Sequence, residues 1–125
     1  MASGSPAGAI EWFRLARRHL RISKGNLEIG YADAAAFYAQ QAVEFALKAL
    51  QIQRTGRFTK THDLSQLAKS VSAPPRVVKL AALVAPVYVG ARYPDVGGPR
   101  INRSRAEVTL DAARRIVRWV RRQLV

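Results

Sequence analysis

Residues 37–50 read "FYAQQAVEFALKAL", and this stretch decides the fold. The longer segment from Tyr31 to Gln53 contains neither glycine nor proline, so nothing in it interrupts a helix. Apolar or small residues cover most of the circumference of a helix over this segment. A helix that is apolar on nearly all sides is surrounded by its neighbours. We therefore expect a long helix at the centre of an all-α domain.

The preceding segment also has helical periodicity and predicts an amphipathic first helix that ends between Gly25 and Gly30. Residues 1–8 are small, and we expect them to be flexible. The rest of the chain, residues 9–125, is predicted to be a single domain, in keeping with its length and 49% apolar content. The apolar stripe of the first helix is Ile10, Phe13, Ala16, Leu20 and Leu27.

A short helix is expected after the central one. Gly56 is a stop signal for the central helix, and Thr61 is the expected N-cap of the short helix. Asp63 is placed to stabilise the positive N-terminal end of this helix, which runs to about Ser70.

Pro74 and Pro75 suit the entry of a fourth helix. Pro86 falls inside the apolar pattern of that helix, so we expect a kink there. Residues 93–102 contain two prolines and two glycines and predict a loop. The core face expected for the fourth helix is Val77, Val78, Leu80, Ala81, Leu83 and Val84.

A last helix is predicted from about Ser104 to Leu124, with acidic residues in its first turns and arginines later, as the helix dipole favours. The whole pattern predicts an up-and-down bundle of four longer helices and one short helix. The apolar stripe of the last helix is Val108, Ala112, Ile116, Val120 and Leu124.

The chain is strongly basic. Twenty-one Lys and Arg residues against eight Asp and Glu residues give a formal net charge of +13. Nucleic acid, a nucleotide and an acidic protein are candidate partners, while a merely solvated surface has the same charge. Sixteen of the basic residues are Arg, whose guanidinium binds phosphate in a bidentate way, and this favours an anionic partner.

Composition also excludes some chemistry. The absence of cysteine excludes disulfides and thiolate catalysis, and His19 and His62 alone do not make a convincing metal site, so we expect no metal and no cofactor. No stretch approaches the ~18 uninterrupted apolar residues of a membrane span, and the N-terminal residues lack the pattern of a signal peptide. We expect a soluble, cytoplasmic protein with no membrane partner.

Residues 37–50 follow the order F-x-x-Q-Q-A-x-E-x-x-L-K-A-L, which resembles the signature helix of HEPN domains. Two further segments agree with that family in order and separation. They are "THDL" at residues 61–64 and "YVGARYPD" at residues 88–95. The resemblance extends from about residue 11 to residue 124.

This resemblance implies an all-α bundle that is commonly dimeric, accompanies a minimal nucleotidyltransferase and is often grouped with toxin–antitoxin systems. The ribonuclease members of the family carry an Arg followed four to six residues later by a His, near the start of the last long helix. The corresponding region here, "PRINRSRAEVTLDAARR", contains no histidine. Arg57 and His62 have a similar spacing but fall in the loop before the short helix. We therefore expect no catalytic residues.

The central helix carries a polar stripe of Gln40, Gln41, Glu44 and Lys48. Such a stripe either joins helices through ion pairs and hydrogen bonds or lines a pocket, because unpaired polar groups are unfavourable in an apolar setting. Glu44 and Lys48 stand four residues apart in the favourable order for an intrahelical ion pair. His62 either belongs to a capping arrangement or contacts an anion at a helix start.

The "YVGARYPD" segment supplies further candidates. Arg92 either pairs with Asp95 or Glu44, or faces the phosphate of a nucleotide, with Tyr88 or Tyr93 as a stacking surface. We expect Glu44, Lys48, His62 and Arg92 to converge near one end of the bundle. The candidate ligand-binding set is Gln40, Gln41, Glu44, Lys48, His62, Tyr88, Arg92, Tyr93 and Asp95.

The functional prediction is a non-catalytic protein that binds a nucleotide or another anionic ligand, or that docks a small nucleotidyltransferase. The alternatives are a metal-independent ribonuclease toxin and a nucleic-acid-binding module without sequence readout. A homodimer is expected, since Trp12 and Trp119 contribute apolar surface that a bundle of this size leaves partly uncovered.

Overall fold

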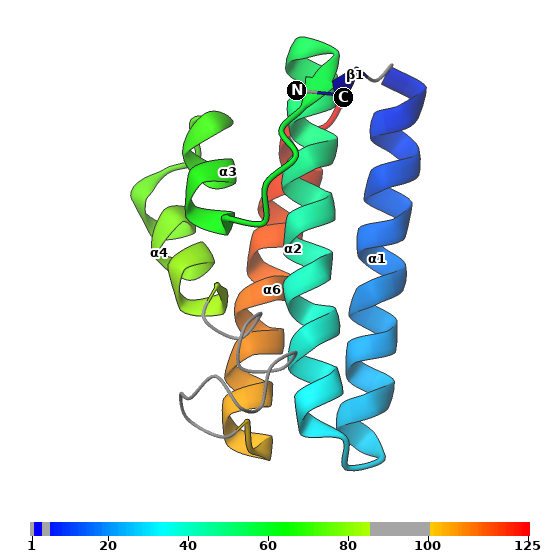
Figure 1. Cartoon of the computed structure of the whole chain (residues 1–125), viewed down its shortest axis with the longest axis vertical. Helices are drawn as coiled ribbons and strands as arrows, with labels where there is room; N and C mark the ends of the chain where they lie inside the picture. Colours follow the sequence, from blue (N-terminus) through cyan, green and yellow to red (C-terminus); the bar gives the residue numbers. More distant parts are fainter. Residues whose placement is uncertain (1, 4–5, 86–100) are drawn as a thin grey trace.

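Three long helices lie side by side in the computed structural model, which describes residues 2–3, 6–85 and 101–125 (Figure 1). They are α1 (Pro6–Glu28), α2 (Ala32–Thr55) and α6 (Arg103–Gln123). Two shorter helices, α3 (Leu64–Ser70) and α4 (Pro75–Val84), pack against α2 and α6 on the side away from α1. The prediction of an all-α bundle is confirmed.

The central position of α2 is also confirmed. Every residue from Ala46 to Ile52 is buried, and these seven residues make nearly two helical turns, so α2 is covered on all sides there. The helix ends at Gly56, whose left-handed φ of 77° allows its N–H to donate to the Ile52 carbonyl at 2.8 Å. The expected stop signal is therefore the actual one.

The N-terminal segment has more regular structure than its composition suggests. Helix α1 begins at Pro6, inside the segment expected to be flexible, and ends at Glu28, within the expected interval. Strand β1 (Ala2–Ser3) pairs antiparallel with β2 (Arg57–Phe58), directly after α2. This two-stranded pairing joins the start of the chain to the loop that leads to α3.

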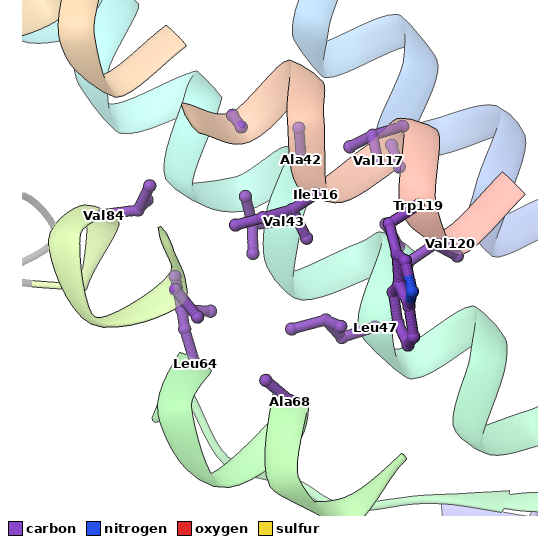
Figure 2. Close-up of a cluster of buried hydrophobic side chains, with 14 of the residues drawn as sticks. Ala42, Val43, Leu47, Leu64, Ala68, Val84, Ile116, Val117, Trp119 and Val120 are labelled. Carbon is purple, nitrogen blue, oxygen red and sulfur yellow. The ribbon is translucent and has the colours of Figure 1, made fainter. Parts of the chain in front are cut away.

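The hydrophobic core lies where α2, α3, α4 and α6 meet, as Figure 2 shows. Val43 and Leu47 from α2, Leu64 and Ala68 from α3, Val84 from α4 and Ile116 from α6 all belong to it. Only Val77, Ala81 and Val84 of the expected face of α4 are fully buried. Pro86 and its expected kink lie outside the described residues.

The predicted stripe of α6 is partly wrong, because it includes an exposed residue and omits several buried ones. Val108 is 49% exposed, whereas Trp119, which the sequence suggested as partly uncovered, is only 7% exposed. The reason is that α6 packs against α1, α2 and α4, so it buries two adjoining faces instead of one stripe. Trp12 is half-buried and packs against Phe45 and Phe58, with ring centroids 5.4 and 4.8 Å away.

The start of α3 corrects a second prediction. The N-cap is Asp63, and its side chain accepts a hydrogen bond from the Gln66 backbone N–H at 3.0 Å. Thr61, the expected cap, instead accepts from the Asp63 backbone N–H at 3.1 Å. The helix therefore starts later than expected.

The end of α3 contains a serine in a conformation that favours glycine. Ser72 has a φ of 55°, while its N–H donates to the Lys69 carbonyl and the next N–H, of Ala73, donates to the Ala68 carbonyl, both at 3.0 Å. This is the hydrogen-bond pattern of a Schellman motif, whose left-handed position glycine occupies with least strain.

Replacing Ser72 by Gly should therefore stabilise the protein, by up to about 1 kcal/mol, because the left-handed conformation strains a residue with a Cβ. Ser72→Val should destabilise it, since a β-branched side chain suits this conformation least. Thermal unfolding followed by circular dichroism measures both changes. Equal melting temperatures for the two variants would contradict the assignment.

Candidate functional site

The carboxylate of Glu44 is the centre of a buried polar cluster. Its side chain is only 4% exposed. One oxygen, Oε2, accepts from Lys48 Nζ at 3.0 Å, and the other, Oε1, lies 2.8 Å from His62 Nδ1. Gln40 Nε2 also approaches Oε1, at 3.5 Å. Both oxygens therefore have partners, which a buried charge requires.

The ammonium group of Lys48 is also compensated. Its side chain is 6% exposed, and Nζ lies 5.6 Å from the centroid of the Phe58 ring in β2, within range of a cation–π interaction. Trp12 of α1 packs against the same ring. The cation is thus held between the Glu44 carboxylate and an aromatic ring.

His62 connects this buried cluster to the surface. Its side chain is 60% exposed, although Nδ1 contacts the buried Glu44. An ionised carboxylate only accepts hydrogen bonds, so Nδ1 carries the hydrogen and donates it. Asp63, the neighbour of His62, caps α3 with its own side chain, while Nδ1 of His62 contacts Glu44 in α2.

A second polar contact, which sequence reasoning missed, fixes the loop that carries His62. Gln51 Nε2 donates to Thr59 Oγ at 3.1 Å and to Ser70 Oγ at 2.8 Å, while Gln51 Oε1 accepts from the Thr59 backbone N–H at 3.0 Å. Gln51 is buried and lies one helical turn after Lys48. The sequence signal for it was that Gln51 continues the polar stripe of this helix one turn beyond Lys48. This residue ties the loop after β2 to both α2 and α3.

The structure brings together five members of the predicted set. Gln41 joins the cluster through a 3.1 Å hydrogen bond to Gln40 Oε1. Glu44 lies near the middle of α2, however, so the cluster is not at one end of the bundle as expected. The residues brought together are Gln40, Gln41, Glu44, Lys48 and His62, while Tyr88, Arg92, Tyr93 and Asp95 lie outside the described residues.

The described part of the chain holds no group of three or more His, Cys, Asp or Glu side chains arranged to bind a metal ion. None of its helices is long and apolar enough to cross a membrane.

Comparison with known proteins identifies the family. The model of the HEPN domain matches residues 9–123, nearly the whole chain. The chain belongs to the HEPN family. The resemblance of the α2 sequence to the HEPN signature helix is thereby confirmed. No curated protein matches the chain.

Solved structures agree with this assignment. A protein designated TT1696 from Thermus thermophilus is 35% identical, with a TM-score of 0.84 over 93% of this chain and 98% of that one. An archaeal HEPN homologue, ST0689, is 30% identical, with a TM-score of 0.78 over 94% of this chain and 98% of that one. A HEPN domain protein from Thermotoga maritima is 26% identical, with a TM-score of 0.74 over 91% of this chain and 97% of that one.

Within this HEPN fold, the Glu44–Lys48 pair should contribute to stability. Glu44→Gln leaves the buried Lys48 ammonium without its counter-charge and should lower the free energy of unfolding by about 3 kcal/mol. The double variant Glu44→Gln, Lys48→Met should recover much of this loss, since neither charge then remains buried. Urea denaturation of the wild type and the two variants measures their free energies of unfolding.

Glu107→Gln is the matched control. Glu107 pairs with Arg103 at 2.9 Å, but both side chains are more than half exposed, so the loss should be below about 0.5 kcal/mol. If Glu44→Gln lowers the free energy of unfolding by no more than Glu107→Gln does, the buried pair does not stabilise the fold.

Proposed function

We propose that this HEPN protein is a non-catalytic binder of a nucleotide or a similar anionic ligand, and that the ligand's phosphate contacts the surface at His62. The observation that carries the proposal is the 2.8 Å contact between the exposed imidazole of His62 and the buried carboxylate of Glu44. This contact orients the ring from behind and leaves most of it at the surface.

The electrostatics of the cluster support an anionic ligand. The charges of Glu44 and Lys48 compensate each other, so the buried pair places no net negative charge behind the exposed imidazole of His62. A phosphate that contacts this ring would form a charge-assisted hydrogen bond there. The formal charge of +13 attracts the same ligands from a distance.

The placement of both histidines supports a non-catalytic role. The segment from Arg103 to Gln123 contains no histidine, although the resemblance to HEPN ribonucleases would require one near its start. His19 Nδ1 lies 2.9 Å from the Leu15 carbonyl, and its ring stacks on Tyr38. Arg57, which has the right spacing from His62, belongs to β2 and is exposed.

A metal-independent ribonuclease is the second candidate, and the same contact favours it. A carboxylate that holds an imidazole by Nδ1 is also the arrangement that orients a general base. The two candidates differ in whether His62 binds phosphate or moves a proton from an RNA hydroxyl group.

His62→Gln separates them. Glutamine retains an N–H that can donate to Glu44, while it removes the imidazole ring. We expect wild-type protein to bind ATP in calorimetry, His62→Gln to bind about tenfold more weakly, and its melting temperature to change little. Neither protein should cleave an unstructured RNA.

Cleavage by the wild type that His62→Gln abolishes would replace the binding role with the ribonuclease. If the wild type does not bind ATP at millimolar concentration and His62→Gln melts at a lower temperature, the Glu44 cluster has only a structural role.

A small nucleotidyltransferase, acting with this chain as a toxin–antitoxin pair, is the partner that we propose on the basis of the family resemblance. Co-expression with a nucleotidyltransferase encoded next to this chain, followed by affinity purification, tests the pairing. Recovery of each protein alone would count against it.

We also propose a homodimer. Trp119 no longer supports it, because that side chain is buried within one chain. Better support comes from Ile29, Tyr31 and Val108, which are 68%, 60% and 49% exposed. Sedimentation equilibrium should give twice the monomer mass, and Tyr31→Lys should shift the protein toward monomer. A wild-type monomer at high micromolar concentration would contradict this proposal.

A further inference from the structure

Helix α6 has a groove on each side of its C-terminal half. The first lies between α4 and α6, has a volume of about 430 Å³ and contains four arginines. Its lining consists of Arg76, Leu80, Arg115, Arg118, Trp119 and Arg122. This groove shares none of its residues with the Glu44 cluster.

The second groove lies between α1 and α6 and has a volume of about 210 Å³. Phe13 and Val117 contribute apolar surface to it. Arg118 lines both grooves, so it forms the wall between them. The arginines of the second groove are Arg17, Arg114, Arg118 and Arg121.

The positive charge of these grooves is largely uncompensated. No carboxylate lines either groove, and among the described residues only Arg115 of these arginines forms an ion pair, with Asp111 at 3.1 Å. Like charges three or four residues apart on a helix destabilise it slightly, and Arg114, Arg118 and Arg121 have this spacing. A bound polyanion would relieve this repulsion.

The arrangement favours an extended anion over a compact one. A helix with its side chains is about 10–12 Å across, so one phosphate cannot occupy grooves on both sides of α6. A strand with regularly spaced phosphates can cross the helix at Arg118 and place a phosphate in each groove. Arg is suited to this role because its guanidinium binds phosphate in a bidentate way.

The surface fits nucleic acid better than an acidic protein. Protein interfaces use exposed aromatic or apolar anchors, and none of the large hydrophobic side chains exposed in the described residues lines either groove. Trp119 is 7% exposed, so its ring offers no platform for a stacked base.

We infer that the C-terminal half of α6 binds the phosphodiester backbone of a nucleic-acid strand. The strand crosses α6 at Arg118, with phosphates in both grooves, and its bases are not read. This site is separate from the proposed contact at His62 and does not depend on it.

Fluorescence anisotropy with labelled 20-nucleotide probes tests the inference on the full chain. We expect Arg118→Gln to weaken binding about tenfold and to reduce the slope of log K against log salt by about one. Two double variants test one groove each, namely Arg76→Gln with Arg122→Gln and Arg17→Gln with Arg121→Gln. Each double variant should weaken binding at least as much as Arg118→Gln. Oligo-dT and oligo-dA should bind within about threefold of each other, since no base is read.

Arg18→Gln is the control, because Arg18 is exposed, carries the same charge and lines neither groove. It should change the affinity less than about twofold. An equal loss in Arg18→Gln and Arg118→Gln would overturn the site in favour of diffuse attraction. If only one of the two double variants weakens binding, the strand does not cross α6 between the grooves. If poly-glutamate binds more tightly than either oligonucleotide, the ligand is an acidic protein and not a nucleic acid.

Discussion

The burial of one carboxylate constrains much of this structure. Glu44 lies on a helix that other elements cover on all sides, so its charge needs partners from within the protein. Lys48 supplies one from the same helix, and His62 supplies the other from a segment eighteen residues away. The second partner is available only if the loop between β2 and α3 follows α2, as it does in Figure 1. Gln51 fixes the same loop through Thr59, so two buried polar groups set its path.

The sequence was sufficient for features that depend on local chemistry. The central helix follows from an uninterrupted apolar segment, and Gly56 ends it because few other residues accept a φ of 77°. The Glu44–Lys48 pair follows from their four-residue separation alone. The choice between Thr61 and Asp63 as the cap of α3 did not follow, because both side chains can accept an N–H. In the structure Asp63 accepts from the Gln66 N–H, and His62, which stands between the two candidates, contacts Glu44 of α2.

Features that depend on how many neighbours a helix has were less predictable. The prediction of an apolar stripe from Val108 to Leu124 assumed that the last helix buries a single face. In the structure α6 contacts α1, α2 and α4. Contact on several sides buries Trp119 and Ala113, and it turns Val108 outward. The same error led to Trp119 being assigned to a dimer surface. Periodicity reports where apolar residues lie on a helix, but it does not say how much of the helix other elements cover.

The wide burial of α6 also explains why its arginines gather. Contacts with three neighbouring helices confine the exposed residues of α6 to one face, and the charged residues of its C-terminal half share that face. The arginines of the last helix were visible in the sequence, where a merely solvated surface also accounted for the charge. The fold adds Arg76 from α4 and Arg17 from α1, which stand across a groove from the arginines of α6. Each groove therefore has arginines on both walls and no carboxylate between them. A counter-charge for these arginines has to come from outside the groove. The basic residues of this domain therefore have two different surroundings. In the interior, Lys48 is paired with Glu44, whereas most arginines of the two grooves have no ion pair among the described residues.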